Sequence, residues 1–405
     1  MLSGLRALDL TDEIGSYCGK ILADLGVEVI KIENPGGDQA RRIGPFWGNT
    51  PDPEKSLYWS ALNSGKKGIT LNIESDEGKS CLKKLVEGSD FIIESSIPEY
   101  LENLGIGYEQ LQEINPELIL TSITPYGRKG PYKTFQGTDI SLMAMSGLMS
   151  IIGYEDRAPL RLGLDQSYLL AGTQAAIGSL FALYQRHFSG YGQEIDVSVN
   201  ECLVLANYRE PLMWEWEKRV AGRTGDRLFR GKGTTKQVWA CKDGYVTWNL
   251  IDNPRMLRSL VDCMDEEGKA GSLTSIDWDH LLIADLSTED ITSIEEPIAS
   301  FFKGHNKNEL QQLSKERNLT LSVLHGIEDV MKAEQLIQRN FWCNLEYPEL
   351  GTSIKVPGSL FHSEEAPSMV RSKAPRIGEH NHEIYMNELG FTHKEVSEMM
   401  EAQVI

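Results

Sequence analysis

The chain has 405 residues, of which 40% are hydrophobic, and its formal net charge at pH 7 is −19. This length exceeds what one hydrophobic core usually supports, so we expect two domains. The acidic excess disfavours nucleic acid and anionic membranes as partners, and an anionic ligand would need a local cluster of cations or backbone amides.

The N-terminal half alternates short apolar strands with helices. Strands are predicted at residues 5–10, 27–33, 68–73, 91–94 and 116–123, and helices at 16–25 and 77–87. Such alternation implies right-handed crossovers and a mostly parallel sheet, whose ligands bind outside the carboxyl ends of the strands. The first turn carries Asp12 and Glu13 and no GxGxxG pattern, so it does not predict a dinucleotide site.

A long amphipathic helix follows. Its apolar residues recur at helical spacing from Leu169 to Tyr184, and small residues such as Gly172 keep it thin enough for another backbone to approach. Gly190 is typical of a helix end, and the alternation over residues 195–199 predicts a strand. Any chemistry would sit in the turn before this helix.

The pattern changes after residue 203. Residues 238–248 predict a hairpin around a Lys-Asp-Gly turn, and residues 254–325 are helical and acidic. We therefore predict an α/β protein with a large domain over residues 1–203 and 326–405 and a smaller inserted domain over 204–325. A helix at 327–339 and a hairpin at 345–360 are expected in the last part.

Three further features carry weaker signals. Gly231-Lys232-Gly233 lacks the spacing of a phosphate-binding loop, which favours a structural turn over a mobile loop above a site. His380 is expected to be structural. Four tryptophans are expected in the core, and the alternative is that they line a pocket for an aromatic acid. They are Trp214, Trp216, Trp239 and Trp248.

The cysteines indicate the compartment. They are scattered without paired spacing, which predicts reduced thiols in the cytoplasm and no metal site. They are Cys18, Cys81, Cys202, Cys241, Cys263 and Cys343. No apolar run approaches the ~20 residues that span a bilayer, and residues 1–6 lack the form of a signal peptide. We expect a cytoplasmic protein without a tightly bound cofactor or metal.

Seven segments, in order along the chain, resemble the class III CoA-transferases, a family that includes formyl-CoA transferase, the carnitine CoA-transferase and the α-methylacyl-CoA racemases. The segments are residues 5–46, 63–69, 122–127, 139–149, 192–198, 242–245 and 378–380. The resemblance covers nearly the whole chain, and the ordered set is specific although each piece alone is not. It implies a Rossmann-like large domain that includes both chain ends. It also implies a dimer whose subunits interlock like linked rings.

The resemblance implies covalent chemistry with a CoA thioester as substrate. An aspartate carboxylate attacks the donor acyl-CoA to form a mixed anhydride, and the CoA thiolate returns to give an aspartyl-CoA thioester. The acceptor acid then takes CoA. In the family this aspartate heads the long helix, where free amides favour a carboxylate and an oxyanion.

The sequence departs from the family at the nucleophile. Counting back four residues from Gly172, or eighteen from Arg186, ends at Tyr168, and a phenol cannot form this anhydride. No catalytic residue is therefore intact. Asp165, three residues earlier, is the fallback nucleophile if the turn rearranges, and a helix cap or turn acid is its ordinary role.

A second departure concerns the CoA phosphates. Many members carry a basic residue in or shortly after the segment that follows the fourth strand, whereas residues 94–103 of this chain include no cation. Its loss should weaken phosphate binding by about 2 kcal/mol. Lys66 matches a phosphate-contacting lysine of the family, with a solvated surface lysine as the alternative. The Arg41-Arg42 pair could meet an anion or be only solvated.

Two functional hypotheses follow. In the preferred one, the chain is the subunit without a nucleophile in a heteromeric CoA-transferase, and a paralogous subunit carries the catalytic aspartate. Some members of the family that the chain resembles work as two unlike subunits, the succinyl-CoA:benzylsuccinate CoA-transferases among them. The assembly would move CoA from an acyl-CoA such as succinyl-CoA to a carboxylic acid, with an aromatic dicarboxylate such as benzylsuccinate suggested by the family. The alternative is a self-sufficient homodimeric CoA-transferase that uses Asp165, or an acyl-CoA racemase-like enzyme.

Overall fold

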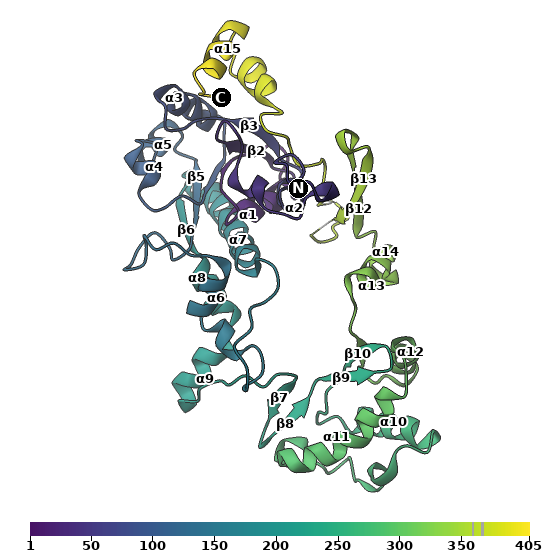
Figure 1. The fold of residues 1–405 in the computed structure, drawn as a ribbon. Helices are drawn as coiled ribbons and strands as arrows, with labels where there is room; N and C mark the ends of the chain where they lie inside the picture. The colour runs from purple at the N-terminus through teal and green to yellow at the C-terminus, as the bar shows by residue number, and fades with distance from the viewer. Residues whose placement is uncertain (359, 366–367) are drawn as a thin grey trace. The chain divides into compact units, whose positions relative to one another are not determined.

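The computed structural model describes residues 1–358, 360–365 and 368–405, which divide into two compact units (Figure 1). The larger unit comprises Met1–Met149, Arg161–Arg219 and Ile337–Ile405, and the smaller comprises Ser150–Leu160 and Val220–Leu336. Within the described ranges, no helix is long and apolar enough to cross a bilayer.

The larger unit is built on a six-stranded parallel sheet in the order β3-β2-β1-β4-β5-β6. The prediction of a Rossmann-like parallel sheet is therefore confirmed. The strands are β1 (Arg6–Leu10), β2 (Glu28–Glu33), β3 (Lys67–Thr70), β4 (Phe91–Glu94), β5 (Ile119–Thr124) and β6 (Glu194–Ser198). The order reverses between β1 and β4, which is where such sheets bind ligands.

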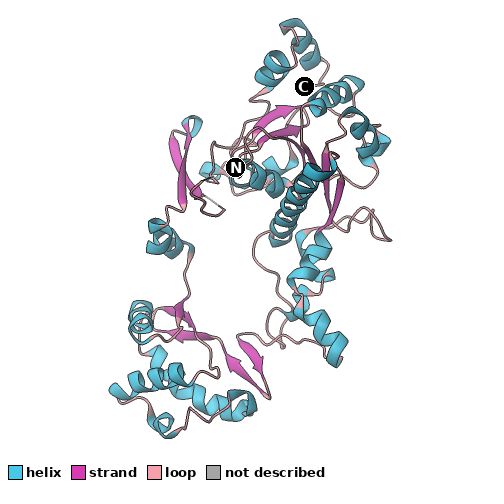
Figure 2. Ribbon diagram, turned by 180° about the vertical axis from the view of Figure 1, so that it is seen from behind, coloured by secondary structure: helices cyan, strands magenta, loops and turns pink. Residues whose placement is uncertain are grey.

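Both faces of the sheet are buried, as a parallel sheet requires. On one face Leu8, Ile92 and Leu120 pack in a core that includes residues of the helix α3 (Asp76–Glu87). Alternate residues of the same strands point to the other face. There the long helix α7 (Gln166–Ser189) contacts β5, and the hydroxyls of Thr121 and Ser179 lie 2.8 Å apart. Figure 2 shows α7 lying across the strands.

The thin helix predicted from the small residues is confirmed. A side chain on Gly172 would lie 2.9 Å from Tyr17 Cβ and 3.0 Å from Cys18 N, so α7 and the helix α1 (Ser16–Asp24) touch backbone to backbone. The remaining helices of the first part are α2 (Leu57–Asn63), α4 (Tyr100–Asn103), α5 (Tyr108–Ile114), α6 (Asp139–Met145), α8 (Val199–Ala206) and α9 (Arg209–Glu217).

The C-terminal segment covers the edge of the sheet. His380 Nδ1 accepts a hydrogen bond of 3.1 Å from Gly68 N, and Asn381 Oδ1 accepts one of 2.9 Å from Thr70 N. These side chains satisfy amides of the edge strand β3, so His380 has the structural role expected of it. The elements nearby are the hairpin β12 (Trp342–Tyr347) and β13 (Thr352–Pro357), the π-helix His382–Glu388 and α15 (His393–Glu401).

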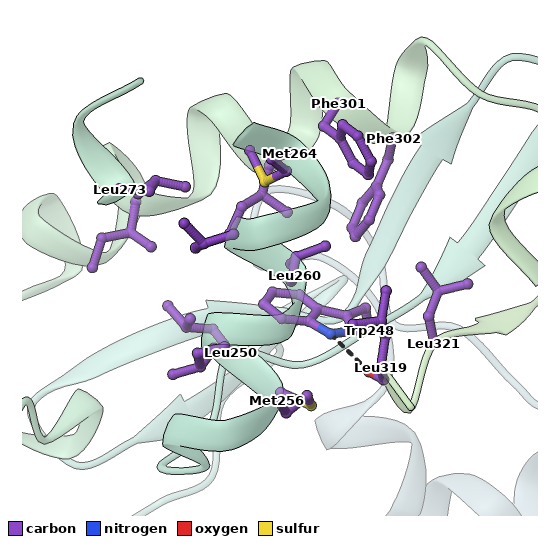
Figure 3. Close-up of a cluster of buried hydrophobic side chains, with 14 of the residues drawn as sticks. Trp248, Leu250, Met256, Leu260, Met264, Leu273, Phe301, Phe302, Leu319 and Leu321 are labelled. Carbon is purple, nitrogen blue, oxygen red and sulfur yellow. Dashed lines mark hydrogen bonds between the residues drawn. The ribbon is translucent and has the colours of Figure 1, made fainter. Parts of the chain in front are cut away.

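The smaller unit has its own core (Figure 3). Trp239, Trp248 and Phe302 meet edge to face, and Trp248 Nε1 donates a hydrogen bond of 3.1 Å to Leu319 O. The elements are β7 (Arg227–Arg230), β8 (Gly233–Lys236), β9 (Val238–Cys241), β10 (Gly244–Thr247), β11 (Ser322–Val323), α10 (Pro254–Glu266), α11 (Thr288–Lys303), α12 (Lys307–Arg317) and α13 (Ile327–Lys332). The helix predicted at 327–339 is divided, because Ala333 is extended and α14 (Glu334–Gln338) follows it.

The core prediction is right for two tryptophans and wrong for the other two. Trp214 and Trp216, on α9, are 51% and 88% exposed. The Gly-Lys-Gly segment is the tight turn between β7 and β8, where a side chain on Gly231 would lie 1.9 Å from Ala284 O.

Candidate active site

A cavity of about 420 Å³ lies at the carboxyl ends of β1 to β4, where a parallel sheet binds its ligand. Four carboxylates line it: Asp12, Glu13, Glu33 and Asp38. Its other polar lining consists of hydroxyls and amides, among them Ser95, Ser96 and Asn34, and none of the lining residues is basic. Glu33 pairs with Arg41 and Asp38 with Lys31, and the lining itself offers a nucleotide diphosphate no basic side chain.

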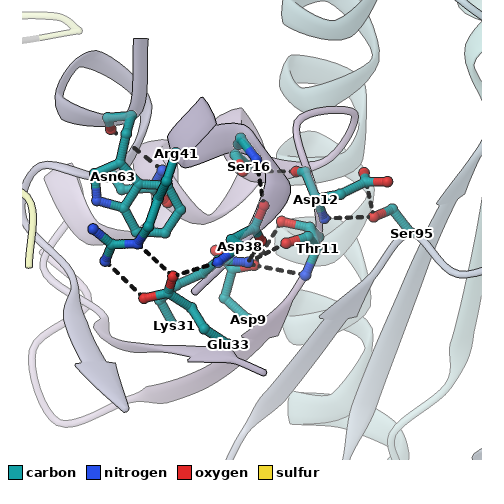
Figure 4. A network of polar contacts seen from close by, with 12 residues as sticks. Asp9, Thr11, Asp12, Ser16, Lys31, Glu33, Asp38, Arg41, Asn63 and Ser95 are labelled. Carbon is teal, nitrogen blue, oxygen red and sulfur yellow. Dashed lines mark hydrogen bonds and ion pairs between the residues drawn. The ribbon is translucent and has the colours of Figure 1, made fainter. Parts of the chain in front are cut away.

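Two buried lysines, Lys66 and Lys31, pair with acids of this region; Figure 4 shows Lys31 beside Asp9 and Asp38. Lys66 Nζ donates to Asp9 Oδ2 at 2.7 Å, to Ser16 O at 2.8 Å and to Asn63 Oδ1 at 2.9 Å. These three acceptors account for all the ammonium hydrogens of Lys66, so a phosphate oxygen would have to displace one of them. Lys31 Nζ donates to Thr11 O and pairs with a carboxylate of the cavity wall, Asp38, at 3.2 Å.

The arginine pair divides between two roles. Arg41 is buried, and its guanidinium forms a two-pronged ion pair with Glu33 at 2.6 and 2.8 Å while stacking on the Trp59 ring at 3.9 Å. It also donates to Pro375 O, which ties the C-terminal segment to this edge. Arg42 is exposed. The interpretation of Arg41 as merely solvated is therefore wrong.

The structure brings a cation to β4 that the sequence did not indicate. Arg128, from the loop after β5, lies against the buried Glu94 at 3.4 Å and against Glu194 at 3.2 Å, and it also pairs with Glu102. Burial raises the pKa of Glu94, although its hydrogen bonds and Arg128 oppose the shift. The only available signal was the position of Arg128 just after a strand. Its charge is balanced by these acids.

The first turn of α7 is fixed from outside the helix. Asp139 Oδ1 accepts hydrogen bonds from Ser167 N at 3.1 Å and from Ser167 Oγ at 2.6 Å, and Asp139 Oδ2 pairs with Arg161 at 3.2 Å. Asp139 and Ser167 are both buried. An amide that could hold an oxyanion at this helix end is therefore already occupied.

Tyr168 and Asp165 both lie at this helix end. Tyr168 is 7% exposed, and burial, followed by the charge of Glu13, raises the pKa of its phenol. Asp165 precedes the helix but does not cap it with its side chain. Its carboxylate lies near Tyr58, and burial, followed by the charge of Asp165, raises the pKa of the Tyr58 phenol.

Glu13 lies close to Tyr168 and Tyr58. From the sequence, it was considered only as an acid of the first turn. Burial raises the pKa of its carboxyl, and the charge of Asp12 adds to the shift. At neutral pH both phenols are protonated and the carboxylates lie near one another. The site thus offers hydrogen-bond donors and acceptors, and a buried, protonated phenol lies at the head of α7. Tyr58 was not singled out from the sequence because it is contributed by α2, which is distant along the chain.

Comparisons with known proteins show the family of the chain. The model of "CoA-transferase family III" matches residues 2–381. Subunit BbsE of the succinyl-CoA:(R)-benzylsuccinate CoA-transferase of Thauera aromatica is 32% identical, over 98% of this chain and 96% of the relative. The succinyl-CoA–D-citramalate CoA-transferase of Chloroflexus aurantiacus is 29% identical, over 100% and 98%. A CAIB/BAIF family protein from Brucella suis has the same fold, with a TM-score of 0.82 over 95% and 98% at 24% identity. The chain therefore belongs to CoA-transferase family III.

Proposed function

We propose that this chain is the subunit without a nucleophile in a heteromeric CoA-transferase, and that a paralogous subunit supplies the catalytic aspartate. The observation that carries the proposal is the buried, protonated phenol of Tyr168 at the head of α7. A neutral phenol in an acidic environment is a poor nucleophile toward a thioester. The 32% identical relative is itself called a subunit.

The charge of the cleft supports the same proposal. Its lining contains four carboxylates and no basic side chain, and the cations around it are neutralised by buried acids. Coenzyme A carries a diphosphate and a further phosphate, which such a lining does not attract. In the proposed assembly the productive CoA cleft belongs to the partner.

An apolar stripe on α7 supports an assembly. Large apolar side chains along one face of the helix are about half to two-thirds exposed, which is unusual for a surface that stays in water. The stripe consists of Ile177, Phe181, Tyr184 and Phe188. Tyr184 and Phe188 touch edge to face, with ring centroids 5.0 Å apart. The proposed partner is a second CoA-transferase subunit that covers this stripe in an interlocked dimer.

The substrates of the assembly are proposed from the relatives. Both relatives described above are named as succinyl-CoA-dependent enzymes, so succinyl-CoA is the proposed donor. An aromatic dicarboxylate such as benzylsuccinate is the proposed acceptor, because the BbsE relative belongs to an enzyme of that acid.

A direct test separates the subunit from the enzyme. The chain is produced alone and together with a paralogue that has aspartate at the Tyr168 position. CoA exchange between succinyl-CoA and benzylsuccinate is then measured for each preparation. We expect no exchange by the chain alone and exchange by the pair. Mass spectrometry after incubation with succinyl-CoA should find the acyl or CoA adduct on the partner's aspartate only. Robust exchange by the chain alone would refute the proposal.

One observation favours the self-sufficient alternative. Asp165 lies at the head of α7 without capping it with its side chain, and its charge raises the pKa of the nearby Tyr58 phenol. A carboxylate held in this way could attack a thioester if the turn moved. The chain alone would then be active, Asp165→Ala would abolish the activity, and Tyr168→Phe would retain it. Asp156→Asn, which changes an exposed acid of the smaller unit, is the matched control.

A further inference from the structure

A second cavity, of about 680 Å³, lies at the amino ends of β1 to β3, away from the carboxyl edge that holds the candidate active site. Its lining combines basic side chains with three glycines of positive φ, Gly4, Gly26 and Gly65. We propose that this cavity binds an oxyanion, either a phosphate or a carboxylate group, with Arg371 as the principal ligand. This proposal does not depend on the proposed function.

The first argument is the balance of charge. The lysines and arginines that line the cavity are Arg6, Lys66, Lys67 and Arg371, whereas the only acid in the lining that the structure describes is Glu28. This local excess contrasts with the net charge of −19 for the whole chain. Within the cavity lining, the Nζ of Lys66 is directed to Asp9, so it contributes little to the cavity.

The remaining cations differ in their partners. Arg6 and Lys67 share Glu28, each at 2.6 Å, and each has a second carboxylate, Glu388 or Glu383, outside the cavity. Arg371 has no ion pair and no hydrogen bond to any residue that the structure describes. Burial raises the pKa of Asp24 and the charge of Arg371 opposes this shift, but the ion pair of Asp24 is with Lys20. The exposed guanidinium of Arg371 thus lines the cavity without an ion pair among the described residues, and the Asp24 carboxylate is the acid whose pKa it influences.

The second argument is the convergence of donors over Gly26. A Cβ atom built on Gly26 would lie 3.1 Å from Arg371 Nη2, 3.4 Å from Ser3 Oγ and 3.5 Å from Ser3 N. None of these three donors has an acceptor in the described part of the chain. A guanidinium, a hydroxyl and a backbone amide that meet in this way match the oxygens of a phosphate or carboxylate. The glycine at 26 leaves room for them, and its φ of +104° is disfavoured for any other residue.

The size of the cavity indicates a larger ligand than the ion alone. A volume of about 680 Å³ falls in the range of small-molecule sites. The lining offers a further hydroxyl, Ser372, and the ring of His380, whose Nδ1 accepts from Gly68 N and so places the hydrogen of the neutral imidazole on Nε2. We therefore expect a phosphorylated or carboxylated metabolite, whose anionic group is recognised at Arg371.

The test uses inorganic phosphate and succinate as separate probes with the full chain and any subunit that copurifies. Thermal unfolding is followed over increasing probe concentration, with potassium chloride keeping the ionic strength constant. A ligand that binds only the folded state raises the melting temperature in a saturable way. We expect saturation with at least one probe, and the probe that binds more tightly identifies the anionic group.

The variants are Arg371→Gln, Arg371→Lys and the control Arg255→Gln, which removes an exposed arginine of the smaller unit. We expect Arg371→Gln to raise the dissociation constant about tenfold, because a charge-assisted pair of hydrogen bonds is lost. The dissociation constant of Arg371→Lys should be intermediate, because lysine retains the positive charge but lacks the paired N–H donors of the guanidinium. Arg255→Gln should bind like the unaltered chain. The absence of saturation with both probes, or an Arg371→Gln affinity equal to that of the unaltered chain, overturns the proposal.

Discussion

Asp139 fixes the start of α7 through Ser167: one carboxylate oxygen accepts both the amide, at 3.1 Å, and the hydroxyl, at 2.6 Å, of the serine. The acid comes from the start of α6, so the cap of α7 is a tertiary contact between two helices. The residue in the ordinary capping position, Asp165, does not cap with its side chain. This arrangement frees Asp165 to meet Tyr58 and holds the first turn of α7 in place.

Removal of this cap should cost stability. We expect Asp139→Ala to lower the free energy of unfolding by about 2 kcal/mol, because a buried amide and a buried hydroxyl lose a charged acceptor. Asp139→Asn, which retains an acceptor oxygen, should lose less. Urea denaturation measures both, with Asp156→Asn as the control at an exposed acid. Equal stability of Asp139→Ala and the unaltered chain would show that the contact does not stabilise α7.

Lys66 should matter for folding. Asp9 and Lys66 have fully buried side chains that lie 2.7 Å apart. Burial opposes the charge of Asp9, but the attraction of Lys66 and Lys31 prevails and lowers its pKa. Lys66→Met leaves a buried carboxylate with one partner fewer, so we expect a loss of about 3 kcal/mol in urea denaturation.

Lys79→Met is the matched control for Lys66→Met. It removes an ion pair with the exposed Asp76 and should cost less than about 1 kcal/mol. If the two variants lose the same free energy of unfolding, the buried ion pair stabilises the fold no more than the exposed one. A normal stability of Lys66→Met combined with a loss of CoA binding would instead assign Lys66 to the ligand.

The phenol of Tyr168 should make stability depend on alkaline pH. Burial and Glu13 raise its pKa in the folded chain, whereas in the unfolded chain it ionises near pH ~10. The folded state therefore keeps a proton that the unfolded state loses, and the contribution is full below about pH 10 and falls as pH rises above it. Tyr168→Phe should flatten this decline in urea denaturation between pH 9 and 11, whereas Tyr191→Phe, at an exposed position, should not. An unchanged slope in Tyr168→Phe would contradict the assigned cause.

An aspartate introduced at the head of α7 should not by itself create an enzyme. In Tyr168→Asp the new carboxylate lies beside Glu13 and Asp165, and the cleft still has no basic lining residue. We expect CoA exchange by this variant alone to stay below about 1% of that of the heteromer, because the phosphates are not held. Tyr168→Asn controls for the change in shape. Strong exchange by Tyr168→Asp would show that only the nucleophile has been lost.

Local patterns in the sequence were sufficient for the elements and the family. Strand and helix periodicity predicted the parallel sheet and α7, whereas the assignment of Tyr168 to the nucleophile position of the family stays a prediction. These features depend on neighbours in the chain. The exposed Trp214 and Trp216 were missed because hydrophobic residue type alone does not say whether a surface is covered.

The residues of the chain determine where the parallel strands and α7 form and that a tyrosine stands in the first turn of α7, since both follow from residue type and local spacing. Only the tertiary structure decided which charges meet. Asp9 faces Lys66, Asp139 faces Ser167 and Arg128 faces Glu94 across strands and helices that are distant along the chain. Pairing of buried charges depends on which segments the fold brings together. The number of residues between two charged side chains in the sequence does not give their distance in space.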